Sequence, residues 1–468
     1  DKSSPLDGDR LNKGTKTKPR SARGLALDIL ATAQRQGRSV EELMAGTLKR
    51  RPGLLRPERA FLLELVQGVK RWELKLDYLI SQASAIPLSK LHPMVLLILR
   101  LAAFQILMLD RVPARAAVHE AGVEAKARRL PPAYGGFINA VLRRLASGDL
   151  PPLPDRETDP DLSLSLEHSH PAWLVQRWLG RYGPGPTAAR LAANNRIPPL
   201  TIRVNTRKTN PETLRIRLAQ EGVEAAPCRF SPVGLHLLEL NVAPLELPSY
   251  QEGWWLFQDE AAQLVTLLLP LEKPRRLLEL GCGRGGKTTH LAENLSGGGL
   301  LLALDQHQGR LKELRRNLKR WNAAVVRPIC ADAAAGLPVK DRTMDAAVLD
   351  APCSALGILR RHPEIKTRLT EADLDTFPPR QRALLESASA ALKPGGRLLY
   401  ITCTTEPAEN EGMIGSFLAD HPEFHLATDA GLLPAPARDL VQPPGWFHSS
   451  PADHDLDGFF AALLAREG

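Results

Sequence analysis

Short apolar runs alternate with amphipathic segments from about residue 271 onward, and this alternation constrains the fold more than any other feature of the chain. Runs typical of buried strands lie at residues 276–280, 300–305, 346–349 and 398–403. Helical patterns between successive strands are typical of βαβ units, which build a parallel sheet with helices on both faces. We therefore predict a Rossmann-like α/β domain over residues 266–468.

Acidic residues close several of these strands. Asp305 ends the strand at 300–305, Asp332 ends a further strand in Ile329-Cys-Ala-Asp332, and Asp350 ends the strand at 346–349, so the three acids close the second, third and fourth strands in chain order. The carboxyl ends of parallel strands meet at one ligand crevice, so the three acids are expected to lie near each other. Asp305 can accept both hydroxyls of a ribose, and Asp332 suits an adenine amino group.

A glycine-rich loop follows the first strand of this domain. It comprises Gly281, Cys282, Gly283, Arg284, Gly285, Gly286 and Lys287. Glycine lets the backbone approach a ligand closely, although a tight turn between strand and helix needs glycine in any case. Together with the three acids, the loop predicts a site for S-adenosylmethionine, which carries no phosphate. NAD is the alternative ligand, because the following helix N-terminus favours a negative group.

Two thiols lie at two of the strand ends. Cys353 follows Asp350 after Ala-Pro, where Pro352 fixes the turn, and Cys403 ends the strand at 398–403. Two cysteines and an aspartate beside a cofactor site indicate thiol attack on an electrophilic carbon. The adjacent Arg360 and Arg361 are expected within reach of a polyanion.

Composition bears on partners and location. The net charge of +9 favours a polyanionic partner, whereas 5% aromatic residues argue against a surface built mainly of base-stacking rings. Five widely spaced cysteines match neither a disulfide framework nor a zinc site, so we expect no metal and a cytoplasmic location.

No secretory signal is visible, and the most apolar run, 94–109, is too short to span a membrane. We expect a monomer with no membrane partner.

The N-terminal third has helical periodicity. Residues 1–20 are expected to form a disordered basic tail, and residues 21–150 a compact all-α domain with a buried helix at 94–109. The basic pairs Arg128/Arg129 and Arg143/Arg144 are equally consistent with solvated faces and with phosphate contacts.

The middle of the chain changes pattern twice. A Pro- and Asp-rich linker is expected at 151–165, followed by a small α+β RNA-binding subdomain at 166–265. Trp254, Trp255 and Phe257 could stack on bases, but we favour packing in the core or at an interface, which is the commoner role.

Two sets of motifs resemble known families. In the N-terminal domain, Val112-Pro-Ala-Arg-Ala-Ala-Val-His-Glu120 and Phe137-Ile-Asn-Ala-Val-Leu-Arg-Arg144 are similar to the NusB-type RNA-binding fold. In the C-terminal domain, Asp350-Ala-Pro-Cys353, Thr402-Cys403-Thr404 and Asp457-Gly-Phe-Phe460 resemble the RNA 5-methylcytosine methyltransferases. With both domains, the chain after residue 20 is similar to the RsmB (Sun, Fmu) branch of ribosomal RNA methyltransferases.

The resemblance implies methyl transfer from S-adenosylmethionine to carbon 5 of cytosine C967 in 16S ribosomal RNA, through a covalent cysteine–C6 adduct. It implies that Cys403 is the nucleophile and that Cys353 assists release. Protonation or hydrogen bonding at N3 helps addition to cytosine, and Asp350 suits this role. The residues alone do not distinguish the thiols, since DNA cytosine methyltransferases use a Pro-Cys nucleophile, which would be Cys353.

The chain departs from the family at one loop and leaves two other functions open. The family usually has Cys-Ala-Ala-Pro where this chain has Gly281-Cys-Gly-Arg284. The alternatives are a tRNA cytosine-C5 methyltransferase and a non-catalytic NusB-like RNA-binding factor. Retention of Lys287, Asp350 and both thiols weighs against the non-catalytic factor.

Overall fold

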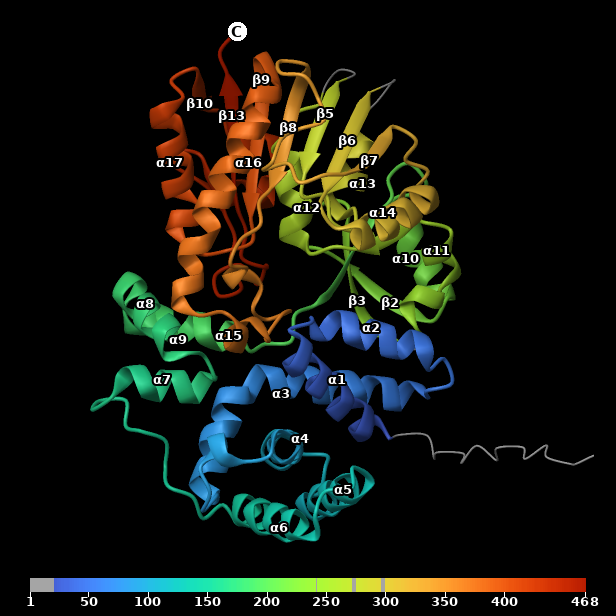
Figure 1. Ribbon diagram of the computed structural model, residues 1–468. Coiled ribbons are helices and arrows are strands. Elements are labelled where there is room, and N and C mark those ends of the chain that lie inside the picture. The colour runs from blue at the N-terminus through green and yellow to red at the C-terminus, as the bar shows by residue number, and fades with distance from the viewer. Residues whose placement is uncertain (1–20, 241, 272–274, 296–298) are drawn as a thin grey trace, which may run out of the picture. The chain divides into compact units, whose positions relative to one another are not determined.

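The structure is a computed structural model that describes residues 21–240, 242–271, 275–295 and 299–468. The basic tail expected at residues 1–20 lies outside the described residues. The chain divides into two compact units: one extends to Val69 and includes Leu79–Pro151, and the other contains Lys70–Tyr78 and Pro152–Gly468 (Figure 1). No helix in the described ranges combines the length and the apolar character needed to cross a bilayer.

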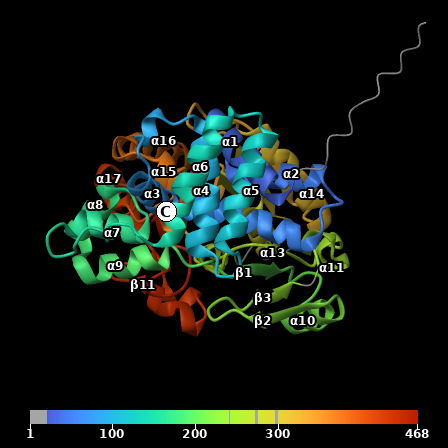
Figure 2. The same cartoon turned by 90° about the horizontal axis from the view of Figure 1, so that it is seen from below.

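In the described residues, the first unit contains helices and no strand. Its elements are α1 (Ala22–Gln36), α2 (Val40–Arg50), most of α3 (Arg56–Ala83), α4 (Pro93–Met108), α5 (Ala114–Ala127) and α6 (Pro132–Ser147). The apolar α4 packs against α1, α5 and α6, which confirms the predicted buried helix (Figure 2). Arg128 belongs to this packing, because its guanidinium donates to the Gly24 carbonyl at 2.9 Å and pairs with Glu124.

The second unit begins with three helices and a small antiparallel sheet. The helices are α7 (Pro160–His168), α8 (Ala172–Tyr182) and α9 (Pro184–Ala193). The sheet has the order β2-β3-β1-β4, from β1 (Leu200–Val204), β2 (Val223–Pro227), β3 (Gly234–Leu240) and β4 (Trp255–Phe257), with α10 (Pro211–Gln220) packed on it. Trp255 is fully buried, as the packing interpretation predicted, whereas Trp254 is partly buried and Phe257 is 37% exposed.

The segment before these helices is shorter than the linker expected at 151–165. Helix α7 begins at Pro160, inside that range. The Asp159 side chain accepts a hydrogen bond from the Leu162 amide at 3.1 Å, and proline suits the first helical turn. This capping signal starts the helix within a sequence rich in proline and aspartate.

The C-terminal domain is built on a larger sheet. Its principal strands are β5 (Arg276–Leu280), β6 (Leu300–Asp305), β7 (Val326–Cys330), β8 (Met344–Asp350), β9 (Leu392–Thr402) and β13 (Phe460–Arg466). With the short strands β11 (Val441–Gln442) and β12 (Trp446–His448), its order is β11-β12-β13-β9-β8-β5-β6-β7. Strands β5 to β9 are parallel, but β13 is antiparallel to β9. The sheet is therefore mixed, because the apolar pattern of a buried strand does not encode its direction.

Helices cover both faces of this sheet (Figure 1). On one face α12 (Glu260–Leu267), α13 (Gly286–Asn294) and α14 (Gln308–Trp321) share a core with alternate strand residues. On the other, α16 (Phe377–Ala391) and α17 (Glu411–Asp420) pack on the intervening residues. These layers confirm the predicted Rossmann-like α/β domain.

A buried arginine joins the small sheet to the C-terminal domain. Arg203 on β1 is completely buried and donates to Glu293 at 3.0 Å, to the Thr289 hydroxyl at 2.8 Å and to the Gly286 carbonyl at 2.7 Å. Burial lowers the pKa of Arg203 to about 10, against the opposing effect of Glu293, so the guanidinium stays charged at neutral pH. This ion pair holds the helix that follows the glycine loop.

We predict that Arg203→Met lowers the free energy of unfolding by about 3–5 kcal/mol, because Glu293 is left buried without its counter-charge. Urea unfolding of the whole protein measures this loss. Arg215→Met is the control, because its pair with Glu212 lies at the surface and contributes little to stability. Equal midpoints for the two variants would contradict the structural role of Arg203.

Candidate active site

The two thiols meet at the carboxyl edge of the large sheet. Strands β8 and β9 are parallel, with Asp350 opposite Ile401, so the loops that follow them leave the sheet side by side. The sulfur atoms of Cys353 and Cys403 lie 3.4 Å apart, and the Cys403 amide also lies 3.4 Å from the Cys353 sulfur. The two thiols can therefore reach the same atom of a substrate.

An ion pair stands beside the thiols. The Lys287 ammonium, from the start of α13, donates to the Asp350 carboxylate at 2.8 Å and lies over the Phe459 ring. Burial lowers the pKa of Lys287, but the Asp350 carboxylate outweighs burial, and the net pKa is raised. Lys287 therefore keeps a positive charge at this edge.

Cys403 is held as a thiol. Its pKa lies well above the usual range because the hydrogen bond with Cys353, burial and the Asp350 charge all favour the protonated form. Lys287 acts in the opposite direction. Attack by Cys403 thus requires removal of a proton, and Lys287 supplies stabilising charge for the thiolate.

A buried glutamate forms hydrogen bonds with residues of both loops that carry the thiols. Glu409 accepts hydrogen bonds from the Ser354 amide at 3.0 Å and from the Gln381 side chain at 2.8 Å, and it also bonds the Ser354 hydroxyl. Its oxygen lies 3.4 Å from the Thr404 hydroxyl. Since Ser354 follows Cys353 and Thr404 follows Cys403, one carboxyl group fixes the separation of the thiols. Glu409 belongs to the Glu409-Asn-Glu411 motif that accompanies Thr402-Cys403-Thr404, but its partner Ser354 lies 55 residues earlier and was not predicted.

A glycine also fixes the Cys403 backbone. The Gly357 amide donates to the Cys403 carbonyl at 3.0 Å, and the Gly458 amide donates to the Gly357 carbonyl at 2.7 Å. A Cβ atom at Gly357 would lie 2.0 Å from the Gly458 oxygen, so no other residue fits between these chains.

The glycine loop packs against the same edge. Gly281 has φ +81°, and a Cβ there would lie 2.4 Å from the Asp350 carbonyl oxygen. The Asp305 carboxylate accepts hydrogen bonds from the Gly283 amide at 3.1 Å and from the His307 amide at 2.7 Å. Asp332 lies farther out, half exposed, and pairs with Arg380 at 3.2 Å.

A carboxyl group that the sequence analysis missed lies on β5, just before the loop. Glu279 is completely buried, and neither of its oxygens has a hydrogen-bond partner in the described ranges. Burial raises its pKa to about 8, against the neighbouring Thr288 and Lys287. Glu279 therefore carries a proton at neutral pH and can donate as well as accept a hydrogen bond. The only sequence signal was an acid inside an apolar strand.

The side chains of two other residues in the glycine loop make contacts away from the carboxyl edge of the sheet. Cys282 is buried in the core, and burial raises the pKa of its thiol. Arg284 is about half exposed and pairs with Glu313 of α14 at 2.9 Å. The loop's backbone and Lys287 thus offer more to a ligand than these two side chains do.

The expectation that Arg360 and Arg361 reach a polyanion is wrong. Arg360 is 1% exposed and pairs with Asp457 at 2.7 Å, and Arg361 pairs with Asp259 at 2.7 Å. These acids lie about a hundred residues away in sequence, so proximity along the chain did not reveal them. The two arginines hold the Asp457 segment against the loop that carries Cys353.

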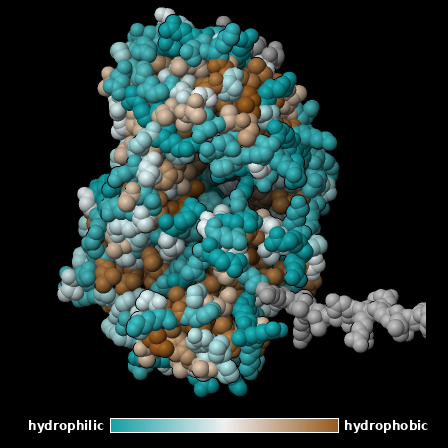
Figure 3. All heavy atoms as spheres, in the orientation of Figure 1, coloured by the Kyte–Doolittle hydropathy of each residue, from teal (hydrophilic) through white to brown (hydrophobic). Residues whose placement is uncertain are grey.

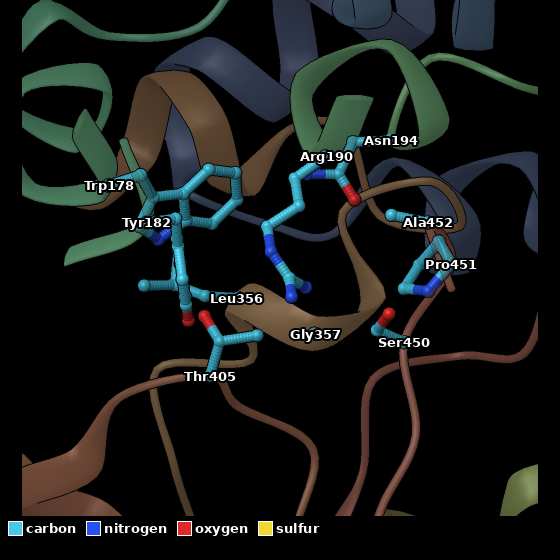
Figure 4. A pocket seen from close by; sticks show the side chains of 10 residues that line it. All are labelled: Trp178, Tyr182, Arg190, Asn194, Leu356, Gly357, Thr405, Ser450, Pro451 and Ala452. Atoms are coloured by element: carbon cyan, nitrogen blue, oxygen red, sulfur yellow. The ribbon is translucent and has the colours of Figure 1, made fainter. Parts of the chain in front are cut away.

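Figure 4 shows a pocket on the α8 and α9 side of the same loops, lined by residues that include Trp178, Tyr182, Arg190, Gly357 and Thr405. It encloses about 10 Å³, which is about the space that one water molecule needs. A nucleoside does not fit there, so this pocket is a small gap between packed side chains. The candidate ligand site is therefore still the carboxyl edge of the large sheet.

The mixed sheet, glycine loop and acids of this edge define the class of S-adenosylmethionine-dependent methyltransferases with a Rossmann-like fold. The 16S rRNA methyltransferase RsmB/F family matches residues 265–465, the NusB family residues 20–147, and the RsmF/B-like ferredoxin-like domain residues 170–242.

Individual relatives span nearly the whole chain. Ribosomal RNA small subunit methyltransferase B of Pseudomonas putida is 36% identical, covering 87% of this chain and 91% of the relative. The protein of that name from Pasteurella multocida is 34% identical, covering 95% and 96%. The crystal structure of PH0851 covers 97% of this chain and 100% of that protein, with 28% identity and a TM-score of 0.80.

The chain belongs to the RsmB family of S-adenosylmethionine-dependent ribosomal RNA methyltransferases. This confirms the family resemblance, the three-part fold and the cofactor inferred from the sequence.

The opposing influences on Cys403 predict two opposite changes in its reactivity. Cys353→Ala removes the hydrogen bond that favours the thiol, so it should lower the pKa of Cys403 and speed its alkylation by iodoacetamide at pH 7.5. Lys287→Met removes the cation that favours the thiolate and should slow alkylation. Each unit of pKa change alters the thiolate fraction about tenfold at a pH well below the pKa.

Mass spectrometry of tryptic peptides measures the alkylation rate at Cys403, with the exposed Cys330 as an internal control. Its rate should be the same in all variants. Slower alkylation in Cys353→Ala, or faster alkylation in Lys287→Met, would contradict this account of the site.

Proposed function

We propose that this protein transfers a methyl group from S-adenosylmethionine to carbon 5 of a cytosine of the C967 type in 16S ribosomal RNA, through a covalent bond between Cys403 and C6. The observation that carries the proposal is the 3.4 Å separation of two thiols beside the Lys287–Asp350 ion pair. The names of the relatives support small-subunit ribosomal RNA as the substrate.

Cytosine chemistry requires such a site. Carbon 5 is a poor nucleophile, and addition of a thiolate to C6 converts the ring to an enamine-like form that can attack an electrophilic methyl group. In the proposal a base takes the Cys403 proton, the thiolate forms the sulfur–C6 bond, and N3 takes up a proton through its hydrogen bond with the Asp350 carboxyl group as the ring accepts the electron pair. After methyl transfer a base takes the C5 proton, the released electron pair forms the C5–C6 double bond, and the sulfur–C6 bond breaks to return the Cys403 thiolate while N3 gives up its proton. Cys353 assists this release.

The residues of the sheet edge suit the cofactor. S-adenosylmethionine, when bound, supplies a methyl group on a positively charged sulfur, and the acids Asp305, Asp350 and Glu279 lie around the loop. We propose that Asp305 holds the ribose hydroxyls and Asp332 the adenine amino group. The unpartnered oxygens of buried Glu279 support a polar ligand near the loop, because buried polar groups usually have partners. The remaining proposed contacts are from Gly281, Gly283, Gly285, Gly286, Lys287 and Asp350, and from the backbone of Cys282 and Arg284, whose side chains are engaged elsewhere.

We further propose that residues 21–150 form an RNA-binding domain joined to the α+β subdomain and the methyltransferase domain at 266–468. Arg143 and Arg144 are exposed on α6 and can contact phosphates, whereas Arg128 is committed to Glu124 within the fold. The monomeric state and the cytoplasmic location remain predictions.

Two variants separate the roles of the thiols. Cys403→Ala should give no methylated product and no denaturant-resistant RNA complex, because no bond to C6 forms. Cys353→Ala should still attack and methylate, but slowed elimination should leave the enzyme attached to methylated RNA. Denaturing electrophoresis after incubation with target RNA and S-adenosylmethionine measures the complex. An adduct with Cys403→Ala and none with Cys353→Ala would make Cys353 the nucleophile.

The target base is tested by bisulfite sequencing of ribosomal and transfer RNA from cells with and without the protein. We expect one cytosine of 16S ribosomal RNA to lose its protection from conversion when the protein is absent. Loss of protection in tRNA alone would favour the tRNA alternative. Full protection of all sites in its absence, together with failure to bind S-adenosylmethionine in a titration, would favour the non-catalytic factor.

A further inference from the structure

Helix α14 has two faces of opposite character. Leu311, Leu314, Leu318 and Trp321 are buried in the core beneath the large sheet. The opposite face carries four exposed basic residues, Lys312, Arg315, Arg316 and Lys319, which we call the α14 stripe. Their spacing of three, four and seven residues places them on one side of the helix, over a length of about 10 Å.

The α14 stripe is not neutralised by the protein. None of its four cations has an ion-pair or hydrogen-bond partner among the residues that the structure describes. The one acid on the helix, Glu313, is already paired with Arg284 at 2.9 Å. Figure 3 shows a hydrophilic surface over the part of the domain where Figure 1 places α14.

Helix stability does not account for this arrangement. Like charges three or four residues apart destabilise a helix, and the stripe contains four such pairs. A helix dipole favours cations only in the last turn, which includes Lys319 but none of the other three residues. A polyanion bound along the stripe would remove this repulsion.

The position of the stripe connects it to the active site. Helix α14 begins three residues after Asp305, and Asn317 on the same helix donates to the Arg284 carbonyl at 2.9 Å. The helix thus packs directly on the glycine loop. The α14 stripe and the thiols therefore belong to the same domain, and the helix that carries the stripe contacts the loop at the ligand edge.

We propose that the α14 stripe binds the phosphate backbone of ribosomal RNA next to the methylated cytosine. This inference rests on the proposed function for its RNA substrate. Contacts to phosphates position RNA but carry no sequence information, so the stripe fixes the strand and leaves the choice of base to the crevice. Salt dependence of binding is the direct signature of such contacts.

The test uses the full chain and a 16S ribosomal RNA transcript, with affinity measured by filter binding across a salt series. Arg315→Gln combined with Arg316→Gln should weaken binding and reduce the slope of log affinity against log salt by about 1.4, at about 0.7 for each contact with single-stranded RNA. Arg315→Lys combined with Arg316→Lys keeps the charge and should retain most of the slope.

The matched control is Lys340→Gln combined with Arg342→Gln. Both residues are exposed in the loop before β8, at the amino-terminal edge of the sheet, so the same charge is removed away from the crevice. This variant should keep the wild-type slope, and all variants should keep wild-type affinity for S-adenosylmethionine.

Equal slopes for the stripe and control variants would overturn the proposal and leave the stripe a solvated surface. Failure of the proposed function is distinguishable, because it appears as absent carbon-5 methylation in bisulfite sequencing. RNA binding can show the predicted change of slope whether or not that modification occurs.

Discussion

The parallel pairing of β8 with β9 is the constraint on which the site depends. Because both strands run in the same direction, with Asp350 opposite Ile401, their following loops share one edge, and two thiols distant in sequence come within 3.4 Å. Glu409 then fixes these loops through hydrogen bonds. Gly357 lets three chain segments pass close together, and its amide binds the Cys403 carbonyl. The chemistry is thus set by backbone pairing first and by side-chain hydrogen bonds second.

The electrostatics of this edge serve two needs. The carboxylates of Asp305 and Asp350 lie beside a loop that suits a cofactor with a cationic sulfur, whereas the buried Glu279 is protonated and adds no charge. The Asp350 carboxylate, burial and the hydrogen bond with Cys353 all disfavour a thiolate, so Cys403 rests in its protonated, less reactive form. Lys287 reconciles the two by neutralising Asp350 at 2.8 Å while lying close enough to lower the pKa of Cys403. In this account the resting site is protected from adventitious alkylation, and the nucleophile forms when a base accepts its proton.

Sequence alone located the strand-end acids and thiols, because apolar runs ending in Asp305, Asp350 or Cys403 predict both the strand and the edge that it reaches. It failed where partners lie far apart in the chain. Arg360 is buried by acids about a hundred residues later, and Glu409 acts on Ser354, 55 residues earlier. The sequence also did not predict that β13 is antiparallel to β9, because a buried strand has the same apolar pattern in either direction.

Release of tritium from carbon 5 tests the central claim most directly. Ribosomal RNA transcribed with [5-³H]cytidine and given to the protein with S-adenosylmethionine should release one tritium into water for each methyl group transferred, because the C5 hydrogen must leave before the sulfur–C6 bond breaks. Cys403→Ala should release none. Methyl transfer by the wild-type protein without tritium release would place the methyl group on another atom and contradict the account.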